Sequence, residues 1–251
     1  MVLWSFALSM GAPPLSMADA SSRPGDASMV LLRQRRGRGR SVLFREARVV
    51  KVFLAGEAKT ELGDWSRLPN YRGEAPEVGL LEALLRRVKT DGWTVVDGIC
   101  WKNIPKYRAH ERLPAEVGNV LGVVMRARKA GCNAVVFSRD RDRDRQREKY
   151  VLAGISRARE VIPDFPKVVG GIAIEAIESW LAALQGRRDA EAAADPSSLL
   201  DESSLASKRA IVEAADLAKL PTDAKSLRQW LTDAAGILGI SATALFGTAR
   251  T

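Results

Sequence analysis

Acidic side chains spaced two residues apart follow a short apolar segment near the middle of the chain. Residues 134–138 (Ala-Val-Val-Phe-Ser) predict a buried strand, and Asp140, Asp142 and Asp144 come soon after it. In a parallel sheet, ligands bind beyond the carboxyl ends of the strands, so acids at this position are well placed to form a cation site. Oxygen ligands of this kind suit Mg²⁺ or Mn²⁺, and these ions in turn suit phosphate chemistry.

Another acid occupies the corresponding place after an earlier strand. Glu57 follows the predicted strand 49–55 and stands next to Gly56, which lets backbone come close. If the two strands are neighbours, Glu57, Asp140 and Asp142 meet at one point. Carboxylates crowded in this way need a cation or protons to offset their repulsion. We therefore predict that these acids form a Mg²⁺ or Mn²⁺ site.

Simpler interpretations of the same residues remain open. The aspartates alternate with arginines from Arg139 onward, so this segment can also be a self-neutralising surface loop. A second alignment of this segment is also possible, in which Asp142 and Asp144, in place of Asp140 and Asp142, are the pair at the metal site. Glu57 alone could cap the following helix. Glu175 is expected in the first turn of a helix, where the helix dipole favours an acid.

The elements that would position these acids alternate along the chain. The pattern predicts strands at 49–55, 93–99, 133–138 and 167–174, and helices at 77–89, 115–129, 146–161 and 175–184. Such alternation indicates an α/β fold, with a mostly parallel sheet flanked by helices. Beyond residue 186 only helices are expected, at 196–205, 207–219 and 223–238. The predicted organisation is a disordered basic arm (1–46), an α/β domain (47–186) and a C-terminal helical extension (187–251).

Three short motifs together resemble the Toprim catalytic domain. They are Ala-Gly-Glu-Ala-Lys-Thr-Glu at 55–61, Asp-Arg-Asp at 140–142 and Ile-Glu-Ala-Ile-Glu-Ser-Trp-Leu at 174–181. The resemblance is closest to Toprim domains related to the OLD-type nucleases and to uncharacterised bacterial Toprim-like proteins, and it covers roughly residues 48–185. It implies a Toprim-like fold in which Glu57 is the metal-linked acid and general base. It also implies that Asp140 and Asp142 bind the metal.

The resemblance also implies a function. The expected activity is that of a Mg²⁺-dependent nuclease or a related phosphodiester or phosphotransfer enzyme, with a possible role in defence against foreign DNA. Glu61, Asp144 and Glu178 are additional candidates for the site, with Glu178 favoured over Glu175, and Lys59, Arg143 and Arg145 are candidates for phosphate binding. Arg147 and Lys149 also fall near the acids, and with Arg143 and Arg145 they either bind flanking phosphates or hold the acidic loop in place. A phosphatase or nucleotide-processing enzyme would use the same acids. The alternative from another class is a noncatalytic module that binds nucleic acid or protein, with a structural acidic loop.

Composition limits the other possibilities. The chain has 251 residues, of which 46% are hydrophobic and 27% charged, as is usual for a globular protein. Cys100, Cys132 and a single histidine, His110, argue against a four-ligand zinc site and against a disulfide framework, and favour a reducing cytoplasm. Residues 1–20 are too interrupted to span a membrane.

The charge of the chain and the lack of a nucleotide-binding motif indicate which partners to expect. The net charge is +9, and arginines are concentrated in the arm, notably at 33–40. Such a tail either holds phosphate backbones non-specifically or is a solvated segment without a partner. No Gly-x-x-x-x-Gly-Lys-Ser/Thr run exists, so nucleotide-driven activity would require a separate ATPase protein. Nucleic acid is the expected partner.

Overall fold

The computed structural model describes residues 49–67, 74, 76–105, 113–201 and 204–247, which belong to one compact unit, Glu46–Thr251. The predicted arm (1–46) and His110 lie outside the described residues.

Four parallel strands form the sheet, in the order β2-β1-β3-β4. They are β1 (Val50–Gly56), β2 (Trp93–Cys100), β3 (Ala134–Asp140) and β4 (Lys167–Ala173). Residues 52–56 of β1 and 134–138 of β3 are buried without interruption. Central parallel strands are covered by helices on both faces, which is why these segments are continuously apolar instead of alternating.

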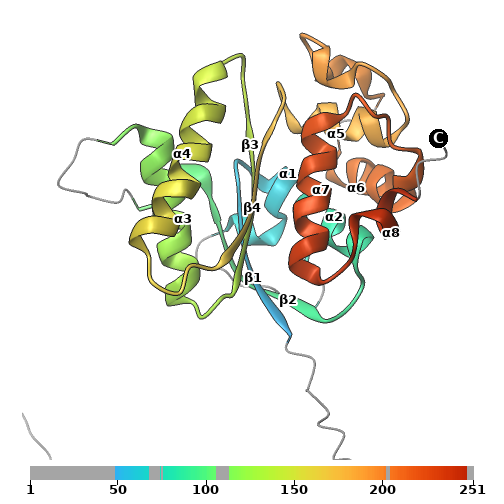
Figure 1. Cartoon of the computed structure of the whole chain (residues 1–251). Helices are drawn as coiled ribbons and strands as arrows, with labels where there is room; N and C mark the ends of the chain where they lie inside the picture. Colours follow the sequence, from blue (N-terminus) through green and yellow to red (C-terminus); the bar gives the residue numbers. More distant parts are fainter. Residues whose placement is uncertain (1–48, 68–73, 75, 106–112, 202–203, 248–251) are drawn as a thin grey trace, which may run out of the picture. The chain divides into compact units, whose positions relative to one another are not determined.

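Helices cover both faces of the sheet (Figure 1). One face packs against α3 (Ala115–Lys129) and α4 (Arg145–Val161), and the other packs against α2 (Leu80–Val88), α5 (Ile177–Leu184) and α7 (Lys225–Leu238). The helix α6 (Leu205–Ala214) packs on α2 and α5 and contributes to the same core. The short helices α1 (Lys59–Leu62) and α8 (Ala242–Phe246) complete the α-helices among the described residues. The predicted α/β class, with a parallel sheet flanked by helices and a helical C-terminal extension, is confirmed and is consistent with a Toprim-like fold.

No helix in the described part of the chain has both the length and the apolar content that crossing a bilayer requires.

The junction between β1 and β3 is the point where the direction of the chain across the sheet reverses. From β1 the chain passes through α2 to β2 on one side of β1. It then passes through α3, on the opposite face, to β3 on the other side of β1. In open α/β sheets the crevice at such a switch point, beyond the carboxyl ends of the strands, is where ligands bind.

The helical extension contributes to the main hydrophobic core. Trp230 of α7 is 1% exposed, and its Nε1 donates a hydrogen bond to the carbonyl oxygen of Phe137 in β3 at 3.0 Å. Its ring meets that of Trp180 with the centroids 5.8 Å apart. Gly171 of β4 leaves the room for it, since a Cβ there would lie 3.2 Å from the Trp230 ring. Trp180, expected to be a core residue, is fully buried.

Some predicted helix limits are wrong. The expected helix 196–205 is only a 3₁₀ turn, Pro196–Leu199, because Leu200 is extended and Ser204 starts α6 as its N-cap. The expected helix 207–219 ends at Ala214 and is followed by another 3₁₀ turn, Leu217–Lys219. Further 3₁₀ turns are Asp64–Ser66, Trp101–Asn103 and Ala190–Ala192.

The helix predicted at 77–89 begins only at Leu80. Val78 forms an isolated antiparallel bridge with Gly63, and the Asp64 carboxylate accepts a hydrogen bond from the backbone N–H of Glu77 at 2.7 Å. These contacts hold residues 77–79 in an extended conformation against the segment that follows α1.

Candidate functional site

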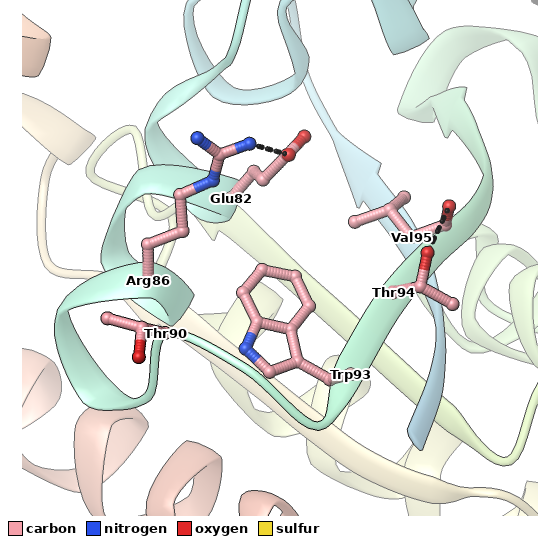
Figure 2. Close-up of a pocket in the computed structure, with 6 residues that line it drawn as sticks. All are labelled: Glu82, Arg86, Thr90, Trp93, Thr94 and Val95. Carbon is pink, nitrogen blue, oxygen red and sulfur yellow. Dashed lines mark hydrogen bonds and ion pairs between the residues drawn. The ribbon is translucent and has the colours of Figure 1, made fainter. Parts of the chain in front are cut away.

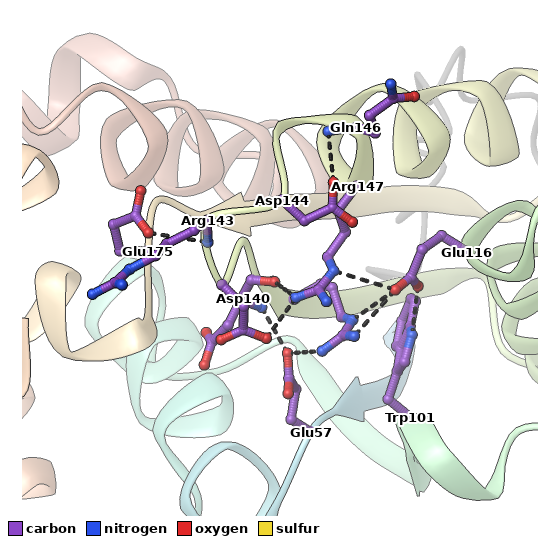
Figure 3. A network of polar contacts seen from close by, with 11 residues as sticks. Glu57, Trp101, Glu116, Asp140, Arg143, Asp144, Gln146, Arg147 and Glu175 are labelled. Atoms are coloured by element: carbon purple, nitrogen blue, oxygen red, sulfur yellow. Dashed lines mark hydrogen bonds and ion pairs between the residues drawn. The ribbon is translucent and has the colours of Figure 1, made fainter. Parts of the chain in front are cut away.

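Glu57 and Asp140 meet at the carboxyl edge of the two central strands. The pairing of β1 with β3 runs from Val52 opposite Ala134 to Ala55 opposite Phe137, so both acids lie just past the paired region. The backbone N–H of Asp140 donates to Oε1 of Glu57 at 2.8 Å. Figure 3 shows the two side chains close together at the centre of a polar network. The acids that the sequence places 83 positions apart are therefore neighbours in space.

Strand alternation sends Arg139 and Asp140 to opposite faces of the sheet. Side chains point alternately to the two faces along a strand. Val136 packs in the core beneath α5 and α7, whereas Phe137 packs in the core beneath α3 and α4. Ser138 and Asp140 share the face of Val136, while Arg139 projects toward α3. This alternation makes Asp140 the strand residue that faces the acids of α1 and α5.

The Asp140 carboxylate is in an environment that disfavours its charge. Burial first, and then the nearby charges of Glu57, Glu61, Glu178 and Asp142, raise the pKa of Asp140 to about 8. Among the described residues, no group donates a hydrogen bond to this carboxylate. The nearby Arg147 donates to the backbone oxygen of Asp140 instead, at 2.6 Å. Asp140, which is partly buried, therefore lacks the compensating contacts that an ionised acid away from water needs.

The remaining aspartates of the loop have different partners. The exposed carboxylate of Asp142 forms an ion pair with Nη1 of Arg147 at 2.6 Å. Asp144 is the N-cap of α4, and its carboxylate accepts from the backbone N–H of Gln146 at 2.9 Å. Asp142 thus lies beside Asp140, whereas Asp144 has a capping contact that explains its presence without a ligand.

The prediction that Glu175 belongs to the first turn of a helix is wrong. Helix α5 begins at Ile177, and Glu175 precedes it in a left-handed conformation with φ 65°. Its carboxylate pairs with Arg141 and accepts from the backbone N–H of Arg143 at 3.1 Å. The backbone N–H of Asp142 donates in turn to the Glu175 carbonyl at 3.1 Å, so these contacts, and not a helix dipole, fix this acid.

Left-handed residues gather around this loop. Asp142 has φ 48° and Arg143 has φ 63°, in addition to Glu175. The three border a pocket of about 400 Å³ that Ala194 and Pro196 also line. Such conformations are costly outside glycine and cluster at sites where the backbone geometry serves a function.

Glu178 and Glu61 lie near Asp140 but have partners of their own. Lys208 of α6, which is 8% exposed, places its Nζ 2.6 Å from Oε1 of Glu178. Glu61 closes the first turn of α1 by accepting from the backbone N–H of Ala58 at 2.8 Å. Burial raises the pKa of Glu61, and the charges of Glu57 and Glu178 add to this effect. It is therefore Glu61, not Glu57, that caps the helix after β1.

The residues predicted to bind phosphate are spread around the acids. Arg143 is exposed and donates to the carbonyl oxygen of Ala194 at 3.3 Å. Arg145 is exposed at the first position of α4. Lys59 forms an ion pair with Glu77 at 2.5 Å. The structure does not bring these three cations to a single point.

Sequence reasoning placed Arg147 near the acids but missed Arg139 as a partner of Glu57, and it missed Glu116 altogether. Arg139 pairs with Glu57 and, through Nε and Nη2, donates to Oε1 of Glu116 at 3.1 Å each. Nε of Arg147 lies 3.5 Å from the same oxygen. Trp101, which is buried, donates from Nε1 to Oε2 of Glu116 at 2.7 Å. Glu116 is thus the common anchor of two arginines, and nothing in the sequence pattern around it indicates this role.

The acids at this edge of the sheet are only partly arranged to hold a divalent cation. Among the described residues, no three His, Cys, Asp or Glu side chains are already arranged to hold a metal ion, since arginines occupy Glu57 and Asp142. Two oxygen groups on one face nevertheless lack partners within the described part of the chain: the Asp140 carboxylate, and Oγ of Ser138, which is buried. Oxygens left without donors, beside an excess of carboxylates, are suited to a hard cation such as Mg²⁺ or Mn²⁺. The residues therefore fit such an ion once the arginines release their carboxylates.

A further pocket lies at the other end of the sheet. It has a volume of about 510 Å³ and lies between α2 and the first residues of β2, where Glu82, Arg86 and Trp93 line it (Figure 2). Arg86 and Glu82 are paired at 2.8 Å within it. Because this pocket adjoins the amino end of an edge strand, it is separate from the carboxyl edge where Glu57 and Asp140 meet.

No protein-family model matches the chain, and no curated protein or solved structure matches it. The arrangement of its own residues is therefore what indicates its function.

Proposed function

We propose that this chain is a Mg²⁺- or Mn²⁺-dependent nuclease, or a related phosphotransfer enzyme of the Toprim type. The observation that carries this proposal is the meeting of Glu57 and Asp140 at the switch point between β1 and β3, with the Asp140 carboxylate left without a donor. Partly buried carboxylates with a strongly perturbed pKa at such a crevice are typical of functional sites.

Asp140, Glu57 and Asp142 are the residues that would hold the cation. When bound, a divalent cation of this kind supplies a water of lowered pKa and positive charge near the reacting phosphate. Glu57 is the group in position to accept a proton, because the N–H of Asp140 fixes its carboxylate at the edge of the sheet. Lys208 offsets the charge of Glu178 and so limits the repulsion within the cluster.

The proposed partners follow from this chemistry. Nucleic acid is the proposed substrate, a separate ATPase is a proposed partner, and defence against foreign DNA is the proposed setting by analogy with the Toprim nucleases. The cytoplasm is the proposed location, supported by the two free, buried cysteines. Burial raises the pKa of Cys132 to about 11, so this thiol is poorly suited to redox chemistry.

A noncatalytic module is the alternative that one observation favours. Arginines already neutralise much of the acidic loop, since Arg139 pairs with Glu57, Arg141 with Glu175 and Arg147 with Asp142. In this alternative the ion pairs only shape the loop, and binding of nucleic acid or protein occurs without cleavage.

Replacement of Glu57 distinguishes the two. The purified full-length protein is incubated with DNA, RNA and nucleotides in Mg²⁺ or Mn²⁺, and the products are separated on gels. We expect the wild type to cleave at least one of these substrates, and Glu57→Gln to slow cleavage by about 100-fold or more, because it removes the general base. Binding of the same nucleic acid, measured by fluorescence anisotropy, is expected to persist.

The matched control is Glu160→Gln, which removes an exposed acid near the end of α4. It is expected to cleave like the wild type. No cleavage of any substrate by the wild type would favour the noncatalytic module. Equal cleavage by the wild type and Glu57→Gln would contradict the role of Glu57 as the general base.

A further inference from the structure

Two arginines contact the candidate cation site while sharing one anchor outside it. Arg139 is 13% exposed and Arg147 is 16% exposed, and both lie against Oε1 of Glu116. Each uses Nη1 to reach an acid of the site, Glu57 for Arg139 and Asp142 for Arg147. Each guanidinium therefore has one edge on the anchor and the other on a predicted metal ligand.

The anchor is itself held rigidly. Trp101 donates to the second oxygen of Glu116 at 2.7 Å, and its buried ring packs against Phe137 with the centroids 5.4 Å apart. The same ring lies 5.9 Å from the guanidinium carbon of Arg139. Burial alone would lower the pKa of Arg139, but Glu57 and Glu116 more than offset it and raise that pKa. Arg139 thus stays charged, and it contacts Glu116 through Nε and Nη2 but Glu57 through Nη1.

Charge balance shows what a divalent cation would change. Without such an ion, Glu57, Glu116 and Asp142 offset the two guanidinium groups. If Glu57 and Asp142 turn to a cation, the two guanidiniums share Glu116 alone. An uncompensated positive charge then faces the site. One Nη1 N–H of each arginine is released to donate, while Nη1 of Arg147 keeps its hydrogen bond to the Asp140 carbonyl. Guanidinium groups arranged in this way match the oxygens of a phosphate.

We propose that Arg139 and Arg147 are the phosphate-binding pair of this site: they hold Glu57 and Asp142 while no cation is bound, and they transfer to a substrate phosphate when a divalent cation takes those carboxylates. This inference rests on the proposed function and adds to it the groups that bind the nucleic-acid backbone. It assigns that role to residues that α3 anchors, in place of the exposed Arg143, Arg145 and Lys59.

The test is a pair of affinities that change in opposite directions. Mn²⁺ binding is measured by electron paramagnetic resonance. Binding of a labelled single-stranded DNA oligonucleotide is measured by anisotropy in Ca²⁺, with a gel to check that the probe is intact. Arg139→Gln is expected to bind Mn²⁺ about 10-fold more tightly, because the arginine no longer competes with the ion for Glu57. The same variant is expected to bind the oligonucleotide about 10-fold more weakly, because a charged hydrogen bond to phosphate is lost.

Two further variants keep the result interpretable. Arg147→Gln is expected to show the same pair of opposite changes, and it carries the test if Arg139→Gln does not fold. Arg128→Gln removes a charge from the far end of α3, where Arg128 lies 3.8 Å from Asp164, and is expected to alter neither affinity. All variants are compared at equal ionic strength, since phosphate binding depends on salt.

A weaker or unchanged Mn²⁺ affinity in both arginine variants would overturn the inference, because arginines with a purely structural role do not compete with the ion. An unchanged oligonucleotide affinity would also overturn it. Either result, with Mn²⁺ still bound by the wild type, leaves the proposed function standing. Absence of Mn²⁺ binding by the wild type would overturn both.

Discussion

Asp140→Asn is expected to be more stable than the wild type at pH 8 when no divalent cation is present. In the folded protein the pKa of Asp140 is raised from 3.8 to about 8, chiefly by burial and then by Glu57, Glu61, Glu178 and Asp142. Between these two pH values the folded state holds a proton that the unfolded state has released, so stability falls as the pH rises. An amide removes this loss, which is on the order of several kcal/mol at pH 8, since each pKa unit corresponds to about 1.4 kcal/mol.

The measurement is thermal unfolding from pH 4 to pH 8 in the presence of a chelator. The difference between Asp140→Asn and the wild type is expected to be small near pH 4, where the unfolded state has lost its proton only in part, and to grow up to pH 8. Asp164→Asn serves as the control, because the side chain of Asp164 is 91% exposed. A difference that does not change with pH, or a variant less stable than the wild type at pH 8, would show that Asp140 is not buried among carboxylates.

Trp230→Ala is expected to destabilise the whole unit, not the helical extension alone. The Trp230 ring is enclosed by Trp180 and the β4 backbone at Gly171, and its N–H holds the carbonyl of Phe137. Replacing a fully buried tryptophan by alanine costs about 3–5 kcal/mol. Phe137 stands three positions before Asp140, so we also expect looser positioning of the candidate site.

Denaturant unfolding monitored by circular dichroism and by tryptophan fluorescence tests this expectation. Trp230→Phe is the matched variant: it keeps a large aromatic ring but loses the N–H donor and part of the indole volume, and its expected cost is about 1–2 kcal/mol. The two signals are expected to change in a single transition. Separate transitions for the sheet and for the C-terminal helices, or no loss of stability in Trp230→Ala, would show that the extension is an independent unit.

The sequence was most informative about the sheet and about the acids that follow its strands. Apolar runs such as 134–138 predict central strands, because such strands are buried on both faces and cannot be mistaken for surface segments. The placement of Glu57 and Asp140 after two such strands was enough to predict their meeting, on the condition that β1 and β3 are neighbours. That condition depends on the order of strands, which local patterns do not encode.

Side-chain partners across long sequence separations were beyond prediction. Arg139 stands 82 positions from Glu57 and 23 from Glu116, so their contacts depend on tertiary packing. Lys208 reaches Glu178 from a helix that the sequence assigns to the extension. Glu175 was misplaced because helix-favouring residues continue through it, whereas contacts with Arg141 and Arg143 hold it in a left-handed conformation.

A calorimetric titration of the full chain with Mg²⁺ and with Mn²⁺ tests most directly whether the acids at the β1–β3 switch point form a cation site. We predict saturable binding by the wild type and by Asp164→Asn, and an affinity at least about 10-fold lower in Asp140→Asn. Absence of binding by the wild type, or equal binding by Asp140→Asn, would contradict the account.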